Sequence, residues 1–283
     1  MKTTIRKVDE PARQLRIGRL LLVVLAAAMV VSSAGCVTTH DSFGFDGQPS
    51  VSRAVAKRDL GIDHLTSRRT GMAIRELRAA LLLDPSDPQT HLWLGESFRR
   101  KGRSEEAEGY LLDAIRFSES NEDSMVSQAA RLTLSALLSQ MGRYEDSLEH
   151  CEALAADPTF VTPWEPLNNC GWALLKLGRI DEAQTRFEDS LDFFPRFGPA
   201  LLNLGILHAN QNHPLTAVQM FERALDSGRL GRSGLAEAHY RLGEIYVALG
   251  RRDKAVLHFR DATDKAPYAS WGSQSQAYLD ILN

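Results

Sequence analysis

Histidine and cysteine side chains are the groups in this sequence that could ligate a metal ion or act as nucleophiles. The histidines are His40, His64, His91, His150, His208, His213, His239 and His258, and the cysteines are Cys36, Cys151 and Cys170. No two histidines lie four residues apart, the spacing that places two imidazoles on one helix face, and no cysteine lies in a CxxC pair. The spacing therefore predicts no metal site, and we expect His64 and His208 to be packing residues.

Paired carboxylates are the other candidates for chemistry, because two of them can act as general acid and general base. The pairs Glu105-Glu106 and Asp181-Glu182 each stand at the start of a stretch with helical periodicity. Acidic residues stabilise the first turn of a helix through the helix dipole, which accounts for both pairs without catalysis. The motifs GxxxxGK[ST], GxGxxG and GxSxG do not occur. We therefore predict that the protein is not an enzyme and has no cofactor and no small-molecule substrate.

The composition excludes several classes of protein. Hydrophobic residues make up 43% and charged residues 24% of the 283 residues, which is typical of a globular chain and not of a collagen-like or disordered one. The formal net charge is −3, so no nucleic-acid partner is expected.

The first segment has the pattern of a secretory signal. Basic residues are frequent in residues 1–19, residues 20–31 are all apolar, and the small residues 32–35 lead directly to Cys36. A helix over the apolar run would span about 18 Å, whereas the hydrocarbon core of a bilayer is about 30 Å thick. Residues 1–35 are therefore predicted to be a signal peptide. The alternative is a single transmembrane anchor in which the small residues extend the apolar run.

The stretch Ser33-Ala34-Gly35-Cys36 resembles the lipobox of bacterial lipoproteins. The resemblance implies cleavage before Cys36, a covalent lipid on this cysteine and a membrane anchor. Residue 37 is Val and not the Asp that marks retention in the inner membrane, so the resemblance implies a lipid-anchored protein of the outer membrane that faces the periplasm. The alternative is a free cysteine that follows a signal by chance.

The remainder of the chain repeats one pattern of small and large apolar residues. A residue pair whose second member is Gly or Ser recurs at 60–61, 94–95, 134–135, 170–171, 204–205 and 242–243. In the copy that starts at Leu204, Ala217 follows and then Phe221 comes four residues later, on one helical stripe. Small residues at these places allow two helices to approach closely. The pattern resembles the tetratricopeptide repeat, a helix–turn–helix unit of about 34 residues.

The repeat predicts an all-α fold, a right-handed α-solenoid of six tetratricopeptide repeats with a short C-terminal capping helix. The predicted units are 54–87, 88–121, 128–161, 164–197, 198–231 and 236–269. Residues 36–53 are predicted to be a lipidated flexible tether, and residues 270–283 to be the capping helix. Gly142, Gly178 and Gly250 fall where the two helices of a unit meet, a turn that favours left-handed backbone.

Cys151 and Cys170 occupy core-facing positions in two adjacent units. A disulfide between them is conceivable in an oxidising compartment. We favour two separate buried thiols, because cysteine is among the most buried residue types.

In the tetratricopeptide repeat family, certain positions of the first helix of each unit face a concave groove. Carried over to this sequence, the candidate protein-binding residues are Arg58, Ile62, Leu92, Glu96, Arg99, Arg100, Asn168, Trp172, Leu202, Ile206 and Tyr240. Trp172, Leu202, Ile206 and Tyr240 would be apolar side chains outside the core of their own units, as is typical of binding surfaces. The alternative is that neighbouring units bury them.

The whole arrangement of lipobox, tether and six repeats resembles the type IV pilus pilotins, the family of PilF, PilW and Tgl. The resemblance implies a scaffold that binds subunits of the outer-membrane secretin and promotes their assembly into the pilus pore. The alternative is a tetratricopeptide-repeat lipoprotein that serves as an adaptor of another cell-envelope machine, for outer-membrane protein assembly or for regulation of a cell-wall enzyme.

Overall fold

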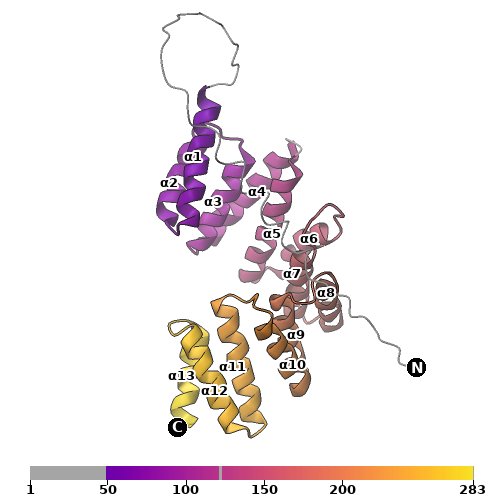
Figure 1. The fold of residues 1–283 in the computed structure, drawn as a ribbon. Helices are drawn as coiled ribbons and strands as arrows, with labels where there is room; N and C mark the ends of the chain where they lie inside the picture. Colours follow the sequence, from indigo (N-terminus) through magenta and orange to yellow (C-terminus); the bar gives the residue numbers. More distant parts are fainter. Residues whose placement is uncertain (1–48, 121–122, 283) are drawn as a thin grey trace, which may run out of the picture. The chain divides into compact units, whose positions relative to one another are not determined.

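A computed structural model describes residues 49–120 and 123–282 of the chain. In these residues every regular element is an α-helix, and consecutive helices form antiparallel hairpins (Figure 1). The helices are α1 (Pro49–Thr66), α2 (Thr70–Leu81), α3 (Pro88–Arg100), α4 (Ser104–Ser120), α5 (Ser124–Gln140), α6 (Tyr144–Ala155), α7 (Trp164–Lys176), α8 (Ile180–Phe193), α9 (Gly198–Asn210), α10 (Pro214–Asp226), α11 (Arg232–Ala248), α12 (Arg252–Lys265) and α13 (Ser270–Leu282). This is the all-α solenoid that the repeat pattern predicts.

The N-terminal predictions fall largely outside the described residues, including the signal peptide, Cys36 and most of the tether. The first helix begins at Pro49, so residues 49–53 are helical, whereas we expected them in the tether. In the part of the chain that the structure describes, no helix combines the length and the apolar character needed to cross a membrane.

The turns inside the hairpins identify the phase of the repeat. One residue in each of these turns has a positive φ angle, as in Gly142, where φ is 78°. The residues are Arg68, Gly102, Gly142, Gly178, Asn212 and Gly250, and each is the fifteenth residue of its predicted unit. Glycine adopts this left-handed conformation without strain, which explains why it fills four of these turns.

In five of the six units, a glycine of the first helix sets how closely the two helices of the hairpin pack. A Cβ atom on Gly95 of α3 would lie 2.7 Å from Cγ of Leu111 in α4, and one on Gly243 of α11 would lie 2.5 Å from Cε1 of Phe259 in α12. Real Cβ atoms do not come this close to another carbon. Both large side chains are fully buried, so the glycines allow the apolar core of the hairpin to close.

The buried apolar residues form two clusters instead of one. The first extends from Leu65 in α1 to Leu138 in α5, and the second from Leu148 in α6 to Leu279 in α13. At the junction, serine hydroxyls replace the small apolar residues of the other units. Oγ of Ser147 in α6 donates to the backbone oxygen of Ser135 in α5, at 2.8 Å. Hydrogen bonds therefore join α5 and α6 where apolar contact joins the helices of other units.

Cys151 of α6 and Cys170 of α7 form a disulfide, with their Cα atoms 5.6 Å apart. The expectation of two separate thiols is wrong. Both residues face the core, but they lie on helices of adjacent units that pack directly against each other, which brings the sulfur atoms within bonding reach. The disulfide thus links the third unit to the fourth.

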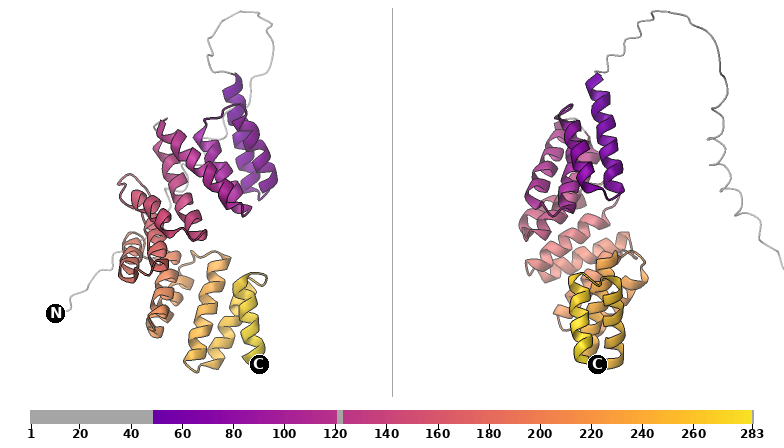
Figure 2. Two further views of the ribbon diagram at one scale, coloured as in Figure 1. Left: turned by 180° about the vertical axis from the view of Figure 1, so that it is seen from behind. Right: turned by 90° about the vertical axis from the view of Figure 1, so that its left-hand side faces the viewer.

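The last helix, α13, packs against both helices of the sixth unit, and the two views of Figure 2 show it beside them in yellow. Leu279 is buried, and the ring of Tyr278 stacks on Phe259 with centroids 4.5 Å apart. α13 therefore covers apolar surface of the sixth unit, and its role as a cap of the repeat array stays a prediction.

Candidate protein-binding groove

A groove with a cavity volume of about 300 Å³ runs along the first helices of consecutive units. Its lining residues come from α3, α5, α7 and the start of α9. They are Glu96, Arg99, Leu132, Thr133, Ala136, Glu165, Asn168, Asn169, Phe197 and Pro199. Four successive units therefore contribute to one concave surface, which fits an elongated ligand better than a compact one.

The groove includes three of the predicted binding residues, Glu96, Arg99 and Asn168. Leu132 and Ala136 occupy the equivalent positions of the third unit. The prediction missed Thr133, Glu165, Asn169, Phe197 and Pro199. Thr133 and Asn169 are the sixth residues of their units, next to the fifth position, from which binding residues were predicted. Phe197 is the last residue of its unit, and the repeat pattern gives no signal for it.

Ion pairs fix the charged end of the groove. Oε2 of Glu96 lies 2.7 Å from Nε of Arg99, and Oε1 of Glu96 lies 2.6 Å from Nε of Arg100. Burial raises the pKa of Glu96, but the hydrogen bonds from the two arginines outweigh it and hold the pKa below the ordinary value. Arg100 also donates to the backbone oxygen of Leu65 in the preceding unit, at 3.2 Å. The carboxylate is therefore charged and held in place.

Amide side chains link the first helices of neighbouring units along the groove. Nδ2 of Asn169 in α7 donates to Oγ of Ser135 in α5 at 3.0 Å, and Nδ2 of Asn203 in α9 donates to Oδ1 of Asn168 at 2.9 Å. These bonds hold the amides in defined orientations before any ligand arrives. Such preorganisation reduces the entropy that is lost on binding.

Glu165 adds a second carboxyl group to the groove wall. Burial raises its pKa, and the hydrogen bond with Thr162 opposes this only in part. The carboxyl of Glu165 is therefore easier to protonate than an exposed one, and it can donate as well as accept hydrogen bonds in mildly acidic conditions.

Four predicted residues from the first two units do not line this groove, namely Arg58, Ile62, Leu92 and Arg100. Nη1 of Arg58 lies 3.1 Å from Oδ2 of Asp87, the residue that caps α3 by accepting from the backbone N–H of Thr90. Leu92 packs on the N-terminal apolar cluster, and Ile62 is half-buried. Arg58 and Leu92 therefore make contacts within the fold.

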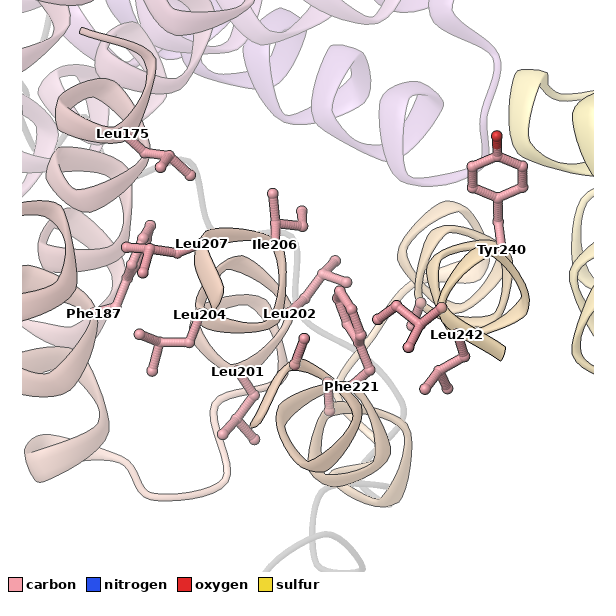
Figure 3. Packing of buried hydrophobic residues seen from close by; sticks show 14 of the residues in the cluster. Leu175, Phe187, Leu201, Leu202, Leu204, Ile206, Leu207, Phe221, Tyr240 and Leu242 are labelled. Atoms are coloured by element: carbon pink, nitrogen blue, oxygen red, sulfur yellow. The ribbon is translucent and has the colours of Figure 1, made fainter. Parts of the chain in front are cut away.

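Leu202, Ile206 and Tyr240 are buried, with exposed fractions of 7%, 6% and 7%. The expectation that they form an exposed apolar patch is wrong. The first helix of each unit packs against the first helix of the next, so residues outside the core of one unit are covered by its neighbour. Leu202 lies between α9 and α11 beside Phe221 (Figure 3).

The polar end of Tyr240 also has partners within the fold. Its hydroxyl donates to Oε1 of Glu244 at 2.8 Å, and its ring lies 5.2 Å from that of Trp271 in α13. Burial is the main cause that raises the pKa of Tyr240, and the carboxylate of Glu244 raises it further. Tyr240 is thus a core residue that α13 covers.

Trp172 is the one member of the predicted apolar set that stays partly exposed. Its ring packs on the C-terminal cluster, and Nζ of Lys176 lies 4.4 Å from the ring centroid, within range of a cation–π interaction. One face of the ring is therefore occupied by a cation.

The sequence matches a known repeat family. A family model described as tetratricopeptide repeat matches residues 58–124, 171–229 and 202–270, which together make up more than half of the chain. No curated protein matches the sequence of this chain.

Solved structures share the fold at low sequence identity. The crystal structure of PilW, described as a widely conserved type IV pilus biogenesis factor, has a TM-score of 0.66 and 19% identity, and the match covers 79% of this chain and 98% of PilW. For pilF of Pseudomonas aeruginosa the TM-score is 0.62 with 19% identity, and 81% of this chain and 99% of that chain are covered. For the APC/C hetero-tetramer Cut9–Hcn1 the values are 0.67 and 18%, with 84% and 43% covered. At these identities the likeness concerns the fold alone.

Proposed function

Because the chain belongs to the tetratricopeptide repeat family, we propose that it is a protein-binding scaffold of the cell envelope that acts as a type IV pilus pilotin. In this role it would be anchored by a lipid on Cys36 and would promote the assembly of secretin subunits in the outer membrane. Tetratricopeptide repeats mediate protein–protein interaction. The observation that supports the pilus role most is the end-to-end match with PilW, 98% of which is covered.

The chemistry of the groove fits a segment of a protein partner. Leu132, Ala136 and Phe197 offer apolar contact, while the fixed amides of Asn168 and Asn169 stand beside them. A peptide segment combines apolar side chains with backbone hydrogen-bonding groups, and this surface offers partners for both. We therefore assign capture of a secretin segment to the groove between α3 and α9.

Two features of the sequence and the fold support a place in the envelope. The lipobox-like stretch before Cys36 supports a lipid anchor, and a single acyl chain anchors a protein only marginally, so more than one chain is needed. The disulfide between Cys151 and Cys170 supports an oxidising compartment, because such bonds are rare in the reducing cytosol. A periplasm-facing location satisfies both.

An adaptor of another envelope machine is the second candidate. The match with the APC/C hetero-tetramer Cut9–Hcn1, with a TM-score of 0.67, leaves room for it, because this fold is shared by proteins other than pilus biogenesis factors. The two candidates differ in their partner and not in their fold.

Deletion of the gene, followed by an assay for heat-resistant secretin multimers, tests the proposal. We expect the multimers and the surface pili to be lost and to return when the wild-type chain is supplied in trans. Normal multimers and normal pili in the deletion strain would contradict the pilotin role. Normal multimers together with a defect in outer-membrane proteins or in the cell wall would favour the adaptor.

The anchor is tested separately by the variant Cys36→Ser. Acyl labelling and membrane association should both be lost, because the sulfur atom would carry the lipid. A Cys36→Ser product that is still labelled and still sediments with membranes would exclude this cysteine as the anchor.

A further inference from the structure

Two histidines of the sixth unit face each other across its hairpin. Nδ1 of His239 in α11 lies 3.1 Å from Nδ1 of His258 in α12. One turn further along α12, Oδ2 of Asp261 lies 3.7 Å from Nδ1 of His239. In the described ranges, 49–120 and 123–282, this is the one group of three such residues whose ligand atoms all lie within 4.8 Å of one another.

These distances suit coordination of one metal ion. Zinc binds imidazole nitrogen at about 2.0–2.1 Å and prefers tetrahedral geometry, so two ligand nitrogens lie roughly 3.3 Å apart. The Nδ1 atoms are separated by 3.1 Å. The carboxylate needs only a small side-chain rotation to become a third ligand. Two imidazoles and one carboxylate leave the fourth position for water or for a side chain of a partner.

Burial of the cluster favours the neutral form of the imidazoles. The side chain of His239 is 13% exposed and that of Asp261 is 54% exposed. Solvent therefore reaches the cluster mainly at the carboxylate of Asp261. Burial lowers the pKa of His239 and of His258, although the nearby carboxylate of Asp261 raises both. Neutral imidazole is the form that binds metals.

The ring of His258 is held by its neighbour. It stacks on the ring of Tyr246 in α11 at 5.4 Å between centroids and an interplanar angle of 5°. This stacking fixes the direction of Nδ1, a role that surrounding groups commonly have at metal sites. One ligand thus sits on a side chain whose rotation is limited before an ion binds.

We propose that His239, His258 and Asp261 form a binding site for a divalent transition-metal ion, with zinc as the best match. Imidazole with a carboxylate suits zinc, whereas magnesium and calcium require oxygen ligands almost entirely. The ion would join α11 to α12 and so would stabilise the hairpin of the sixth unit. The site lies outside the groove and does not depend on the pilotin role.

Without metal, the same geometry is a direct hydrogen bond between two imidazoles, one as donor and one as acceptor. A zinc titration of the full chain, purified without a polyhistidine tag and followed by calorimetry, separates the two cases. We expect one Zn²⁺ per chain in the wild type, and at least about tenfold weaker binding in His258→Gln, which removes one ligand. Zinc should also raise the melting temperature of the wild type, and a chelator should reverse the rise.

The matched control is His213→Gln. His213 belongs to the other histidine pair of the C-terminal half, whose ring centroids lie 6.2 Å apart, and its loss should leave zinc binding unchanged. If circular dichroism shows that His258→Gln does not fold, the variant Asp261→Asn is used instead, because Asp261 is exposed. Asp261→Asn should also bind zinc more weakly than the wild type. The proposal is overturned if the wild type binds no zinc, if His258→Gln or a folded Asp261→Asn binds it as tightly as the wild type, or if His213→Gln loses it equally.

Discussion

The aromatic ring of Phe221 occupies the space that a side chain at Gly205 would need. A Cβ atom on Gly205 would lie 2.6 Å from both Cδ1 and Cε1 of Phe221, and the ring is fully buried. Gly171 stands in the same relation to Phe187. The contact between the first and second helices of these units therefore depends on the absence of one carbon atom.

We predict that Gly205→Ala lowers the free energy of unfolding by about 1–3 kcal/mol, because the buried ring cannot move aside without strain. Gly109→Ala is the control, since Gly109 lies inside α4 and a Cβ there would meet no atom within 4 Å. That change should stabilise the chain by roughly 0.5–1 kcal/mol through helix propensity. Urea unfolding followed by circular dichroism measures both variants, and equal stability of the two would refute the close-packing account.

The phase of the repeat could be predicted from the sequence because it depends on contacts inside one hairpin. The spacing from Gly205 to Phe221 is fixed by two helices and a short turn, so a local pattern records it. The left-handed turn residues, such as Gly142 and Gly178, have φ angles that follow from the same local rule.

The disulfide should stabilise the junction between the third and fourth units. The two cysteines are 19 residues apart, and closing a loop of this size contributes about 3 kcal/mol, mainly by restricting the unfolded chain. We expect the melting temperature of the wild type to fall in the presence of a reducing agent. The double variant Cys151→Ala/Cys170→Ala should melt at the lower temperature and be insensitive to reduction. A wild-type melting temperature that does not respond to full reduction would argue against a stabilising bond.

Buried and groove-lining apolar positions should respond differently to a charge. Ile206→Asp is expected to lower the free energy of unfolding by more than about 3 kcal/mol, because it places a carboxylate in the C-terminal cluster. Ala136→Glu introduces a charge at the half-buried wall of the groove and should cost less than about 1 kcal/mol. Thermal unfolding of both variants measures the difference. A loss of less than about 1 kcal/mol in Ile206→Asp would show that Ile206 is exposed and not buried.

Glu96 should contribute to the acid sensitivity of the fold. Its folded pKa is held below the unfolded value of 4.5, so its ion pairs stabilise the chain above that value. This contribution is lost as the pH falls from about 4.5 through the folded pKa. Glu96→Gln should therefore show a smaller loss of stability between pH 6 and pH 3 than the wild type, measured by urea unfolding at each pH. If the stability of Glu96→Gln and of the wild type fell equally between pH 6 and pH 3, the ion pairs of Glu96 would not stabilise the fold.

Most of the positions that could not be predicted depend on contacts between units, and one pair lies inside a single hairpin but outside the repeat pattern. Ile206 lies outside the core of its own unit, and only the packing of α9 against its neighbours shows that it is buried. The disulfide likewise joins two units, and its cysteines share no local motif. His239 and His258 are brought together by the hairpin of the sixth unit across 19 residues, a separation that no helical spacing rule detects.

The most direct test of the scaffold account is photo-crosslinking from the groove in living cells. A photoreactive residue in place of Ala136 should form a crosslink to the secretin subunit, because that position lines the groove. The same residue in place of Leu257, which is 59% exposed on α12, should form none, since it lies away from the groove. Secretin adducts from position 257 but not from 136, or from neither position while the chain is folded and present, would contradict the assignment of the groove.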